Sequence, residues 1–304
     1  MKHLITVVGP TAIGKTSLSI ALAKNFNAPI ISCDSRQFYK ETTIGTAVPT
    51  EEEQMQAPHY FIQNRSIYDN YNVGQFERDA LEVLDELFKK YNVVIMVGGS
   101  GLYVDAVLKG LDYFPEIKPE IREQLNRDFE KEGLSNLQER LKSFDLETYN
   151  SIELENPHRV IRALEVCISS GKTYASFKNK PKRKRNFNSI KVGLDADRQV
   201  IYDRINQRVD LMVKAGLIEE AKKVYPHKAL NALQTVGYRE LFAFFDGTIS
   251  LDFAIEEIKK NTRRFAKRQL TWFRKDTNTH WFDYNCPKHD IVSKLENEIS
   301  SSLQ

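Results

Sequence analysis

Eight consecutive residues carry the clearest chemical pattern of the chain, G-x-x-x-x-G-K-[ST]. They are Gly9, Pro10, Thr11, Ala12, Ile13, Gly14, Lys15 and Thr16. An apolar run at residues 4–8 precedes them and a helical stretch at residues 17–26 follows, which is the context in which this pattern cradles phosphate groups. Lys15 supplies a full positive charge, and Thr16 can ligate Mg²⁺. The pattern predicts a site for a di- or triphosphate; the alternative is a turn that only closes a βα unit.

A carboxylate and a hydroxyl stand where two later apolar runs end. Asp34 follows the run at residues 29–33, and Ser100 follows the run at residues 93–97. Ligands of open parallel sheets bind beyond the carboxyl ends of the strands, so we expect both side chains to face the phosphate loop. There Asp34 can take a proton from an attacking nucleophile. The structural alternatives are a turn cap for Asp34 and a helix N-cap for Ser100.

The strand that usually carries a magnesium-binding carboxylate in nucleotide-hydrolysing P-loop proteins lacks one here. The run at residues 93–97 leads directly into Gly98, Gly99, Ser100 and Gly101. Such enzymes commonly end a later strand in an Asp that holds the Mg²⁺ shell. A small-metabolite kinase is therefore the less favoured interpretation of the P-loop.

Alternating apolar runs and helical patterns predict an α/β fold, a P-loop parallel-sheet core with helices on both faces. The clearest helix spans residues 73–89, and Asn72 and Gln75 are placed like a loose capping box at its start. Helical patterns then follow without a strand candidate until residues 189–194. We therefore expect a first part of the core at 1–115, a helical insertion at 116–188, and a second part of the core at 189–304 with one strand and C-terminal helices.

Charge is nearly balanced over the 304 residues, with 44 basic and 41 acidic side chains, but its distribution is uneven. A dense basic run lies at residues 178–185, and a basic segment with interleaved aromatic residues lies at 263–275. Two such segments favour contact with a polyanion. The alternatives are a solvated loop and an amphipathic helix that buries Phe265, Leu270 and Phe273.

Cysteine usage and hydropathy limit the setting of the protein. Three scattered cysteines form no C-x-x-C pair, which argues against a disulfide framework or a zinc site. The first apolar run leaves no room for a signal peptide, and no run approaches the length of a membrane span. We expect a cytoplasmic, monomeric protein with no membrane partner.

Ten sequence blocks, in the same order, resemble those of the tRNA dimethylallyltransferases, also called tRNA isopentenyltransferases. The resemblance extends from the first strand to about Trp281. The blocks are GPTAIGKT at 9–16, ISCDSRQFY at 31–39, IGTA at 44–47, APH at 57–59, VGGSGLY at 97–103, RVIRALEV at 159–166, SGK at 170–172, RVDLM at 208–212, VGYR at 236–239 and AKRQLTW at 266–272.

The resemblance implies transfer of a dimethylallyl group from dimethylallyl diphosphate to N6 of the adenine immediately 3′ of the anticodon in tRNA. The P-loop would then hold the diphosphate of the donor, Mg²⁺ would be bound partly through Thr16, and no ATP would be consumed. Arg208 resembles a family arginine near the diphosphate. Asp34 would accept the proton of the adenine amine, and Ser100 would orient the reacting groups.

The resemblance also implies contacts with the anticodon arm of tRNA. The positions that match the family pattern are Asp34, Ser35, Arg36, Gln37, Ser100, Arg122, His158, Arg159, Val160, Ile161 and Arg162. A solvated helix face is the alternative for the arginines of the insertion.

Two positions depart from the family pattern. Ser100 stands where many relatives have Thr, and Gln234 stands where some relatives carry a basic residue, which puts a phosphate or RNA contact at Gln234 in doubt. An isopentenyltransferase acting on free adenine nucleotides is the closest rival, although it would not require the helical insertion or the basic segments. A non-catalytic RNA-binding protein is disfavoured by the phosphate loop beside a placed carboxylate.

Overall fold

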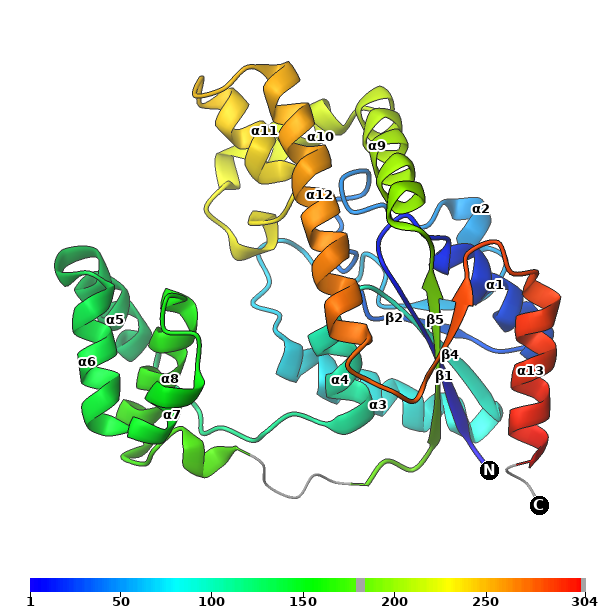
Figure 1. Ribbon diagram of the computed structural model, residues 1–304, viewed down its shortest axis with the longest axis horizontal. Coiled ribbons are helices and arrows are strands. Elements are labelled where there is room, and N and C mark those ends of the chain that lie inside the picture. The colour runs from blue at the N-terminus through cyan, green and yellow to red at the C-terminus, as the bar shows by residue number, and fades with distance from the viewer. Residues whose placement is uncertain (179–183, 302–304) are drawn as a thin grey trace. The chain divides into compact units, whose positions relative to one another are not determined.

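The computed structural model describes residues 1–178 and 184–301, and the chain in it forms two compact units (Figure 1). One unit comprises Met1–Lys109 and Arg185–Gln304, and the other comprises Gly110–Lys184. Within the described residues, no helix combines the length and apolar character needed to cross a membrane.

The first unit is built on a parallel sheet of six strands in the order β3-β2-β4-β1-β5-β6. The strands are β1 (His3–Val8), β2 (Ile30–Ser32), β3 (His59–Tyr60), β4 (Val93–Val97), β5 (Asn188–Asp195) and β6 (Thr279–Asp283). The predicted α/β class with a parallel-sheet core is therefore confirmed, and the four predicted strands are those of its centre. The sequence pattern missed β3 and β6.

Side chains on both faces of the central strands are buried, as expected for a parallel sheet that carries helices on each side. In β1, Leu4 and Val8 belong to one apolar cluster, whereas Ile5 and Val7 belong to another. This is why the strands read as continuous apolar runs in the sequence instead of alternating with polar residues.

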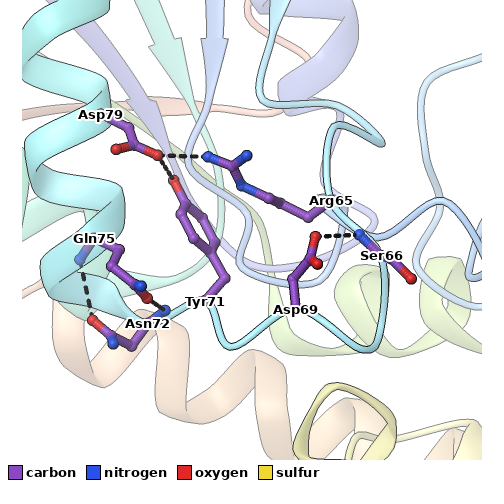
Figure 2. Close-up of polar contacts among 7 residues, drawn as sticks. All are labelled: Arg65, Ser66, Asp69, Tyr71, Asn72, Gln75 and Asp79. Atoms are coloured by element: carbon purple, nitrogen blue, oxygen red, sulfur yellow. Dashed lines mark hydrogen bonds and ion pairs between the residues drawn. The ribbon is translucent and has the colours of Figure 1, made fainter.

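One face of the sheet is covered by α3 (Val73–Lys90) and α4 (Gly101–Lys109). The predicted capping box at the start of α3 is present. The Asn72 side chain accepts a hydrogen bond from the Gly74 N–H. It also accepts one from the Gln75 N–H, and the Gln75 side chain accepts one from the Asn72 N–H (Figure 2). These bonds satisfy N–H groups that a helix start otherwise leaves open.

The opposite face is covered by α1 (Lys15–Phe26), α9 (Arg198–Lys214) and α13 (Lys288–Ser301). A long helix, α12 (Leu251–Phe273), contributes Ala266 to this cluster and Phe273 to the other. Phe273 is buried and Leu270 is partly buried, but Phe265 is exposed, so only part of this segment packs in the core.

A third apolar cluster joins α9 and α12 to α10 (Leu217–Val224) and α11 (Tyr238–Phe245). Its buried centre includes Leu233, Tyr238 and Leu241. Shorter elements connect the main ones. They are α2 (Glu51–Gln54), η1 (Ala175–Phe177), η2 (Tyr225–His227) and η3 (Asn231–Leu233).

The second unit is helical, and its apolar core is formed mainly by Leu125, Leu137, Leu141 and Leu164. Its helices are α5 (Pro119–Glu132), α6 (Leu134–Phe144), α7 (Leu146–Ser151) and α8 (Pro157–Ser170). The helical character expected of the insertion is thus observed. Its predicted contact with tRNA stays a prediction.

Candidate active site

The P-loop connects β1 to α1 in a conformation that depends on glycine. Gly9 and Gly14 have φ angles of 143° and 110°, and a Cβ on Gly9 would lie 2.5 Å from the Leu194 carbonyl oxygen. No side chain caps the start of α1, because Gly14 occupies the N-cap position. The N–H groups of the first turn therefore remain available to an anion.

Lys15 lies within this loop, and its Nζ donates a 2.7 Å hydrogen bond to the Pro10 carbonyl oxygen. Burial of the ammonium group lowers the pKa of Lys15 to about 8, whereas the nearby Asp34 carboxylate acts in the opposite direction. An anion bound beside Lys15 would stabilise its charged form, because the anion would replace the lost hydration.

Two arginines of α9 donate hydrogen bonds to the P-loop. Arg208 Nη1 donates to Thr11 Oγ1 at 3.2 Å, and Arg204 Nε donates to the Ala12 carbonyl oxygen at 2.7 Å. Burial and the Arg204 charge lower the pKa of Arg208, and Asp34 opposes this effect. Arg208 was predicted and Arg204 was not. The spacing of four residues, which places both on one face of the helix, is the signal that could have suggested Arg204.

Asp34 and Ser100 lie at the neighbouring ends of β2 and β4. Asp34 Oδ1 accepts a 3.0 Å hydrogen bond from the Arg36 N–H, so the carboxylate also caps a turn. The Ser100 hydroxyl accepts from the Ser35 N–H at 3.1 Å and lies 3.0 Å from Ser35 Oγ. Ser100 thus connects the two strand ends, in addition to standing before α4.

Gln269 joins the P-loop to the end of β4, and its role was not predicted. Its Oε1 accepts from the Thr11 N–H at 2.9 Å, and its Nε2 donates to the Gly99 carbonyl oxygen at 2.9 Å. The side chain is buried, and a Cβ on Gly99 would lie 2.1 Å from its Nε2. Gln269 therefore fixes the spacing between the phosphate loop and the segment that carries Ser100.

A cavity of about 480 Å³ brings these groups together. Its polar lining includes Thr11, Asp34, Ser35, Arg36, Ser100 and Arg208. Its apolar lining includes three partly exposed side chains: Leu102 (46% exposed), Phe265 (38%) and Trp272 (39%). A cavity with one charged end and one apolar rim suits a ligand that combines phosphate with an apolar or aromatic group.

Trp272 is held in place at this rim. Its Nε1 donates to Asp105 Oδ2 at 2.9 Å, and a Cβ on Gly101 would lie 2.3 Å from the indole ring. Phe265, Arg268 and Trp272 all come from α12 and all line the cavity. The basic and aromatic segment noted in the sequence therefore presents two rings and a guanidinium to the cavity.

The loop after Asp34 is supported by hydrogen bonds within the first unit. Arg36 Nη1 donates to the carbonyl oxygens of Asn231 and Ala232 at 3.2 and 3.1 Å. Gln37 Nε2 donates to the carbonyl oxygens of Thr46 and Ala47 at 3.3 and 2.8 Å. The side chains of Arg36 and Gln37 thus hold the cavity wall in this structure, and their predicted RNA contacts remain predictions.

A second set of contacts supports this loop from the segment that precedes α3 (Figure 2). The Arg65 backbone forms an isolated β-bridge with Tyr39. The Asp79 carboxylate accepts hydrogen bonds from Arg65 Nη2 at 2.7 Å and from the Tyr71 hydroxyl at 3.0 Å. Arg65 also stacks over the Tyr71 ring. The loop is therefore anchored to α3.

The remaining predicted RNA-binding residues lie in the second unit, on α5 and α8. His158 and Arg159 are exposed, whereas Val160 and Ile161 are buried in the core of the unit. Because an α-helix has 3.6 residues per turn, two neighbouring residues can face the core while the two before them face solvent. The side chains at 160 and 161 thus serve packing.

Arg122 and Arg162 converge on one buried carboxylate that the sequence analysis did not select. Arg162 Nη1 lies 2.6 Å from Glu165 Oε1, and Arg122 Nη1 lies 3.2 Å from Glu165 Oε2. Glu165 is almost fully buried, whereas both arginines remain partly exposed. The Arg162 guanidinium also lies over the Phe114 ring, at 5.2 Å from its centroid. The two guanidinium groups are therefore oriented before any ligand binds.

Of the basic run at 178–185, residues 179–183 lie outside the described residues. Arg185 has a structural position: it donates to the carbonyl oxygens of Ala106 and Val107 and forms a 2.6 Å ion pair with Glu77. Its side chain is only 14% exposed. The last residue of the run therefore anchors the chain to the core where the first unit resumes.

Comparison with known proteins agrees with this geometry. Residues 37–276 match the family model described as IPP transferase. A tRNA dimethylallyltransferase from Flavobacterium johnsoniae is 59% identical, with 100% of each chain covered. The crystal structure of the full-length tRNA isopentenylpyrophosphate transferase from Bacillus halodurans is 36% identical, with a TM-score of 0.73 over 100% of this chain and 97% of that chain.

A more distant structure, of a eukaryotic dimethylallyltransferase acting on tRNA, has a TM-score of 0.84 at 22% identity over 99% of this chain and 80% of that chain. At that identity it supports the fold alone. The family model and the full-length relatives are decisive, since they cover most or all of the chain. The chain belongs to the IPP transferase family.

Proposed function

We propose that this protein transfers a dimethylallyl group from dimethylallyl diphosphate to N6 of the adenine 3′-adjacent to the anticodon in tRNA, with release of diphosphate. The observation that carries the proposal is that Thr11, Arg208, Asp34 and Ser100 all line the same cavity. Close relatives that are named tRNA dimethylallyltransferases support the choice of substrates.

The donor diphosphate would bind at the charged end of the cavity. The open N–H groups of α1, Lys15 and Arg208 would offset the negative charge that grows on the diphosphate as the allylic C–O bond breaks. The apolar rim would receive the dimethylallyl chain or the adenine ring. Arg204 and Gln269 would keep the P-loop in place without needing to touch the donor.

Mg²⁺ fits this site. Among the described residues, no group of three or more His, Cys, Asp or Glu side chains could hold a metal. Mg²⁺ usually keeps several waters and binds the phosphates of its substrate, and in a P-loop the Ser/Thr hydroxyl is a protein ligand that Thr16 would supply. When bound, the ion would supply positive charge next to the diphosphate.

The acceptor amine would be activated by Asp34. The N6 lone pair forms a bond to the allylic carbon, the C–O electrons leave with the diphosphate, and the N6 proton passes to the Asp34 carboxylate. Because an adenine amine is a weak nucleophile, its orientation matters as much as proton removal. Ser100, fixed by Ser35, would provide that orientation.

The helical unit would bind the anticodon arm of the tRNA through Arg122, His158, Arg159 and Arg162. Partly exposed guanidinium groups suit phosphate contacts. The three free cysteines fit a reducing compartment, and we propose that the enzyme acts in the cytoplasm as a monomer.

The direct test is to incubate the protein with unmodified tRNA, Mg²⁺ and dimethylallyl diphosphate, without ATP, and to analyse the nucleosides by mass. We expect one adenosine to gain a five-carbon group in the anticodon loop. A requirement for ATP would favour a kinase, and modification of free adenine nucleotides but not tRNA would favour the nucleotide-directed rival.

A further inference from the structure

One wall of the candidate active-site cavity is a short loop, residues 43–47, which we call the wall loop. Its residues Gly45, Thr46 and Ala47 line the cavity together with Asp34. The first two residues of the loop, Thr43 and Ile44, line a separate hollow of about 590 Å³. The wall loop thus borders both the cavity and this hollow.

A single carboxylate holds the first half of the wall loop. Glu220 Oε2 accepts hydrogen bonds from the N–H groups of Thr43 and Ile44 at 2.9 and 2.8 Å, and Oε1 accepts from the Gly45 N–H at 2.9 Å. The Tyr238 hydroxyl donates to the same Oε1 at 2.6 Å. Three consecutive N–H groups that converge on one anion form a strong and geometrically defined contact.

Tyr238 adds a steric constraint to this contact. The ring is fully buried, and a Cβ on Gly45 would lie 2.6 Å from its hydroxyl oxygen. Burial of the phenol, and to a lesser extent the proximity of Glu220, raise the pKa of Tyr238, so the hydroxyl stays a donor to the carboxylate. Only glycine fits between the ring and the cavity.

Gln37 holds the second half of the wall loop with the opposite polarity. Its Nε2 donates to the Thr46 and Ala47 carbonyl oxygens, and its Oε1 accepts from Ser32 Oγ at 3.2 Å. The loop is therefore fixed by an acceptor at one end and a donor at the other. The P-loop, in contrast, is held by Arg204 and Gln269.

We propose that Glu220 is a positioning residue for the transfer reaction: from outside the cavity, it sets the position of the wall against which the reacting groups are aligned. This inference rests on the proposed function. Because different residues hold the phosphate end, loss of the Glu220 contact will impair alignment and leave donor binding nearly intact. A displacement of about 1 Å in an active site can lower turnover by about 10²-fold.

The test compares E220Q with E219Q, a matched change on the neighbouring, exposed position of α10. In E220Q an amide NH₂ replaces one of the two accepting oxygens and faces an N–H donor. We expect kcat to fall by about 10–100-fold while KM for dimethylallyl diphosphate stays within about threefold of the wild-type value. We expect E219Q to match the wild type.

Chemical rescue distinguishes positioning from a general structural role. In E220A the three N–H groups remain, and the hollow that Thr43, Ile44 and residue 220 line gives acetate a route to them. Acetate is expected to restore part of kcat in E220A and to leave E219A unchanged. Unchanged kcat in E220Q would overturn the inference alone, as would a fall in thermal stability and donor binding in parallel with kcat. A wild-type enzyme that transfers no dimethylallyl group would overturn the proposed function itself.

Discussion

The end of the cavity that is proposed to bind the donor diphosphate, here called the phosphate end, and the arginine pair Arg122 and Arg162 of the helical unit both present positive charge, but they hold it differently. At the phosphate end, Lys15 and Arg208 are bound to P-loop atoms, and burial lowers the pKa of each. In the helical unit, Arg122 and Arg162 are partly exposed and share the buried Glu165. The charges of the first region are partly withdrawn from solvent, whereas those of the second are more exposed and are oriented by Glu165.

This difference suits two functions, stabilisation of a leaving group and recognition of an RNA backbone. A reaction that develops charge on a leaving group benefits from donors that are fixed and desolvated before the substrate arrives. Recognition of an RNA backbone needs several cations at a helix surface, each contributing modestly and in a salt-dependent manner. Substitutions at the phosphate end should therefore change turnover or donor affinity steeply, and those in the helical unit should change RNA affinity gradually.

The largest effect is expected from D34N, which removes the proton acceptor while preserving size. We expect kcat to fall by about 10²–10⁴-fold, because proton removal occurs in the transition state. Affinity for tRNA, measured by fluorescence anisotropy, should change little. D203N, at an exposed position of α9, is the control. A D34N variant with near-normal turnover would exclude Asp34 as the base.

The next largest effect is expected from K15A, which removes the partly buried charge at the P-loop. K15A should raise KM for dimethylallyl diphosphate by about 10–100-fold, because a charge-assisted contact is lost. In the wild type, affinity for inorganic diphosphate should fall as pH rises through about 8, since the folded-state pKa of Lys15 is about 8. Calorimetric titration at several pH values checks this, and a K15A protein with the same pH profile would contradict it.

The lowered pKa of Lys15 also affects stability: the free energy of unfolding should rise with pH over an interval in which diphosphate affinity falls. Because the unfolded chain keeps Lys15 protonated to higher pH than the folded protein does, the contribution of Lys15 to the free energy of unfolding should rise between about pH 8 and 10.5. In the difference between wild type and K15A, thermal denaturation should therefore show a relative gain for the wild type over that interval. A flat difference would show that burial does not perturb the ammonium group.

A smaller effect is expected in the helical unit. R162A should weaken binding to all tRNAs alike and should reduce the magnitude of the salt dependence by about 0.7–0.9 per lost phosphate contact. E165Q should weaken binding less, because both guanidinium groups remain but lose their shared carboxylate. R127A, a change at an exposed arginine of α5, is the matched control. Equal effects of R127A and R162A would indicate a diffuse charge effect without an oriented arginine pair.

The smallest effects are expected in the basic run at 178–185, where the lysines and Arg185 should affect different properties. Neutralising Lys178, Lys180, Lys182 and Lys184 should flatten the salt dependence of tRNA binding and leave thermal stability unchanged. R185A should do the reverse, since Arg185 is bound to Glu77 and to two carbonyl oxygens of α4. If the lysine variant binds tRNA with an unchanged salt dependence, the run is only a solvated connector.

The parts of this site that the sequence predicted are those set by local pattern. A glycine-rich turn between a strand and a helix, and side chains that follow apolar runs, fix the positions of the P-loop, Asp34 and Ser100 relative to the sheet edge. The periodicity of α3 predicted its bounds closely for the same reason. In contrast, β6 was missed because its sequence, THWFD, is too polar to resemble the buried central strands.

The residues that were missed act across long sequence separations. Gln269 and Thr11 are 258 positions apart, Arg204 and Ala12 are 192 apart, and Glu220 and Thr43 are 177 apart. Nothing in a local pattern indicates which distant backbone group such a side chain will meet, because the meeting depends on how the helices of the second part of the core pack on the sheet.

In the proposed reaction, one cavity couples the release of diphosphate to proton removal from an RNA adenine. Its most direct test is to quantify diphosphate and modified adenine in the same reaction, with and without unmodified tRNA and in the absence of ATP. We predict equal amounts of the two products with tRNA, and no diphosphate without it. Diphosphate release that is independent of tRNA, or that requires ATP, would contradict this coupling.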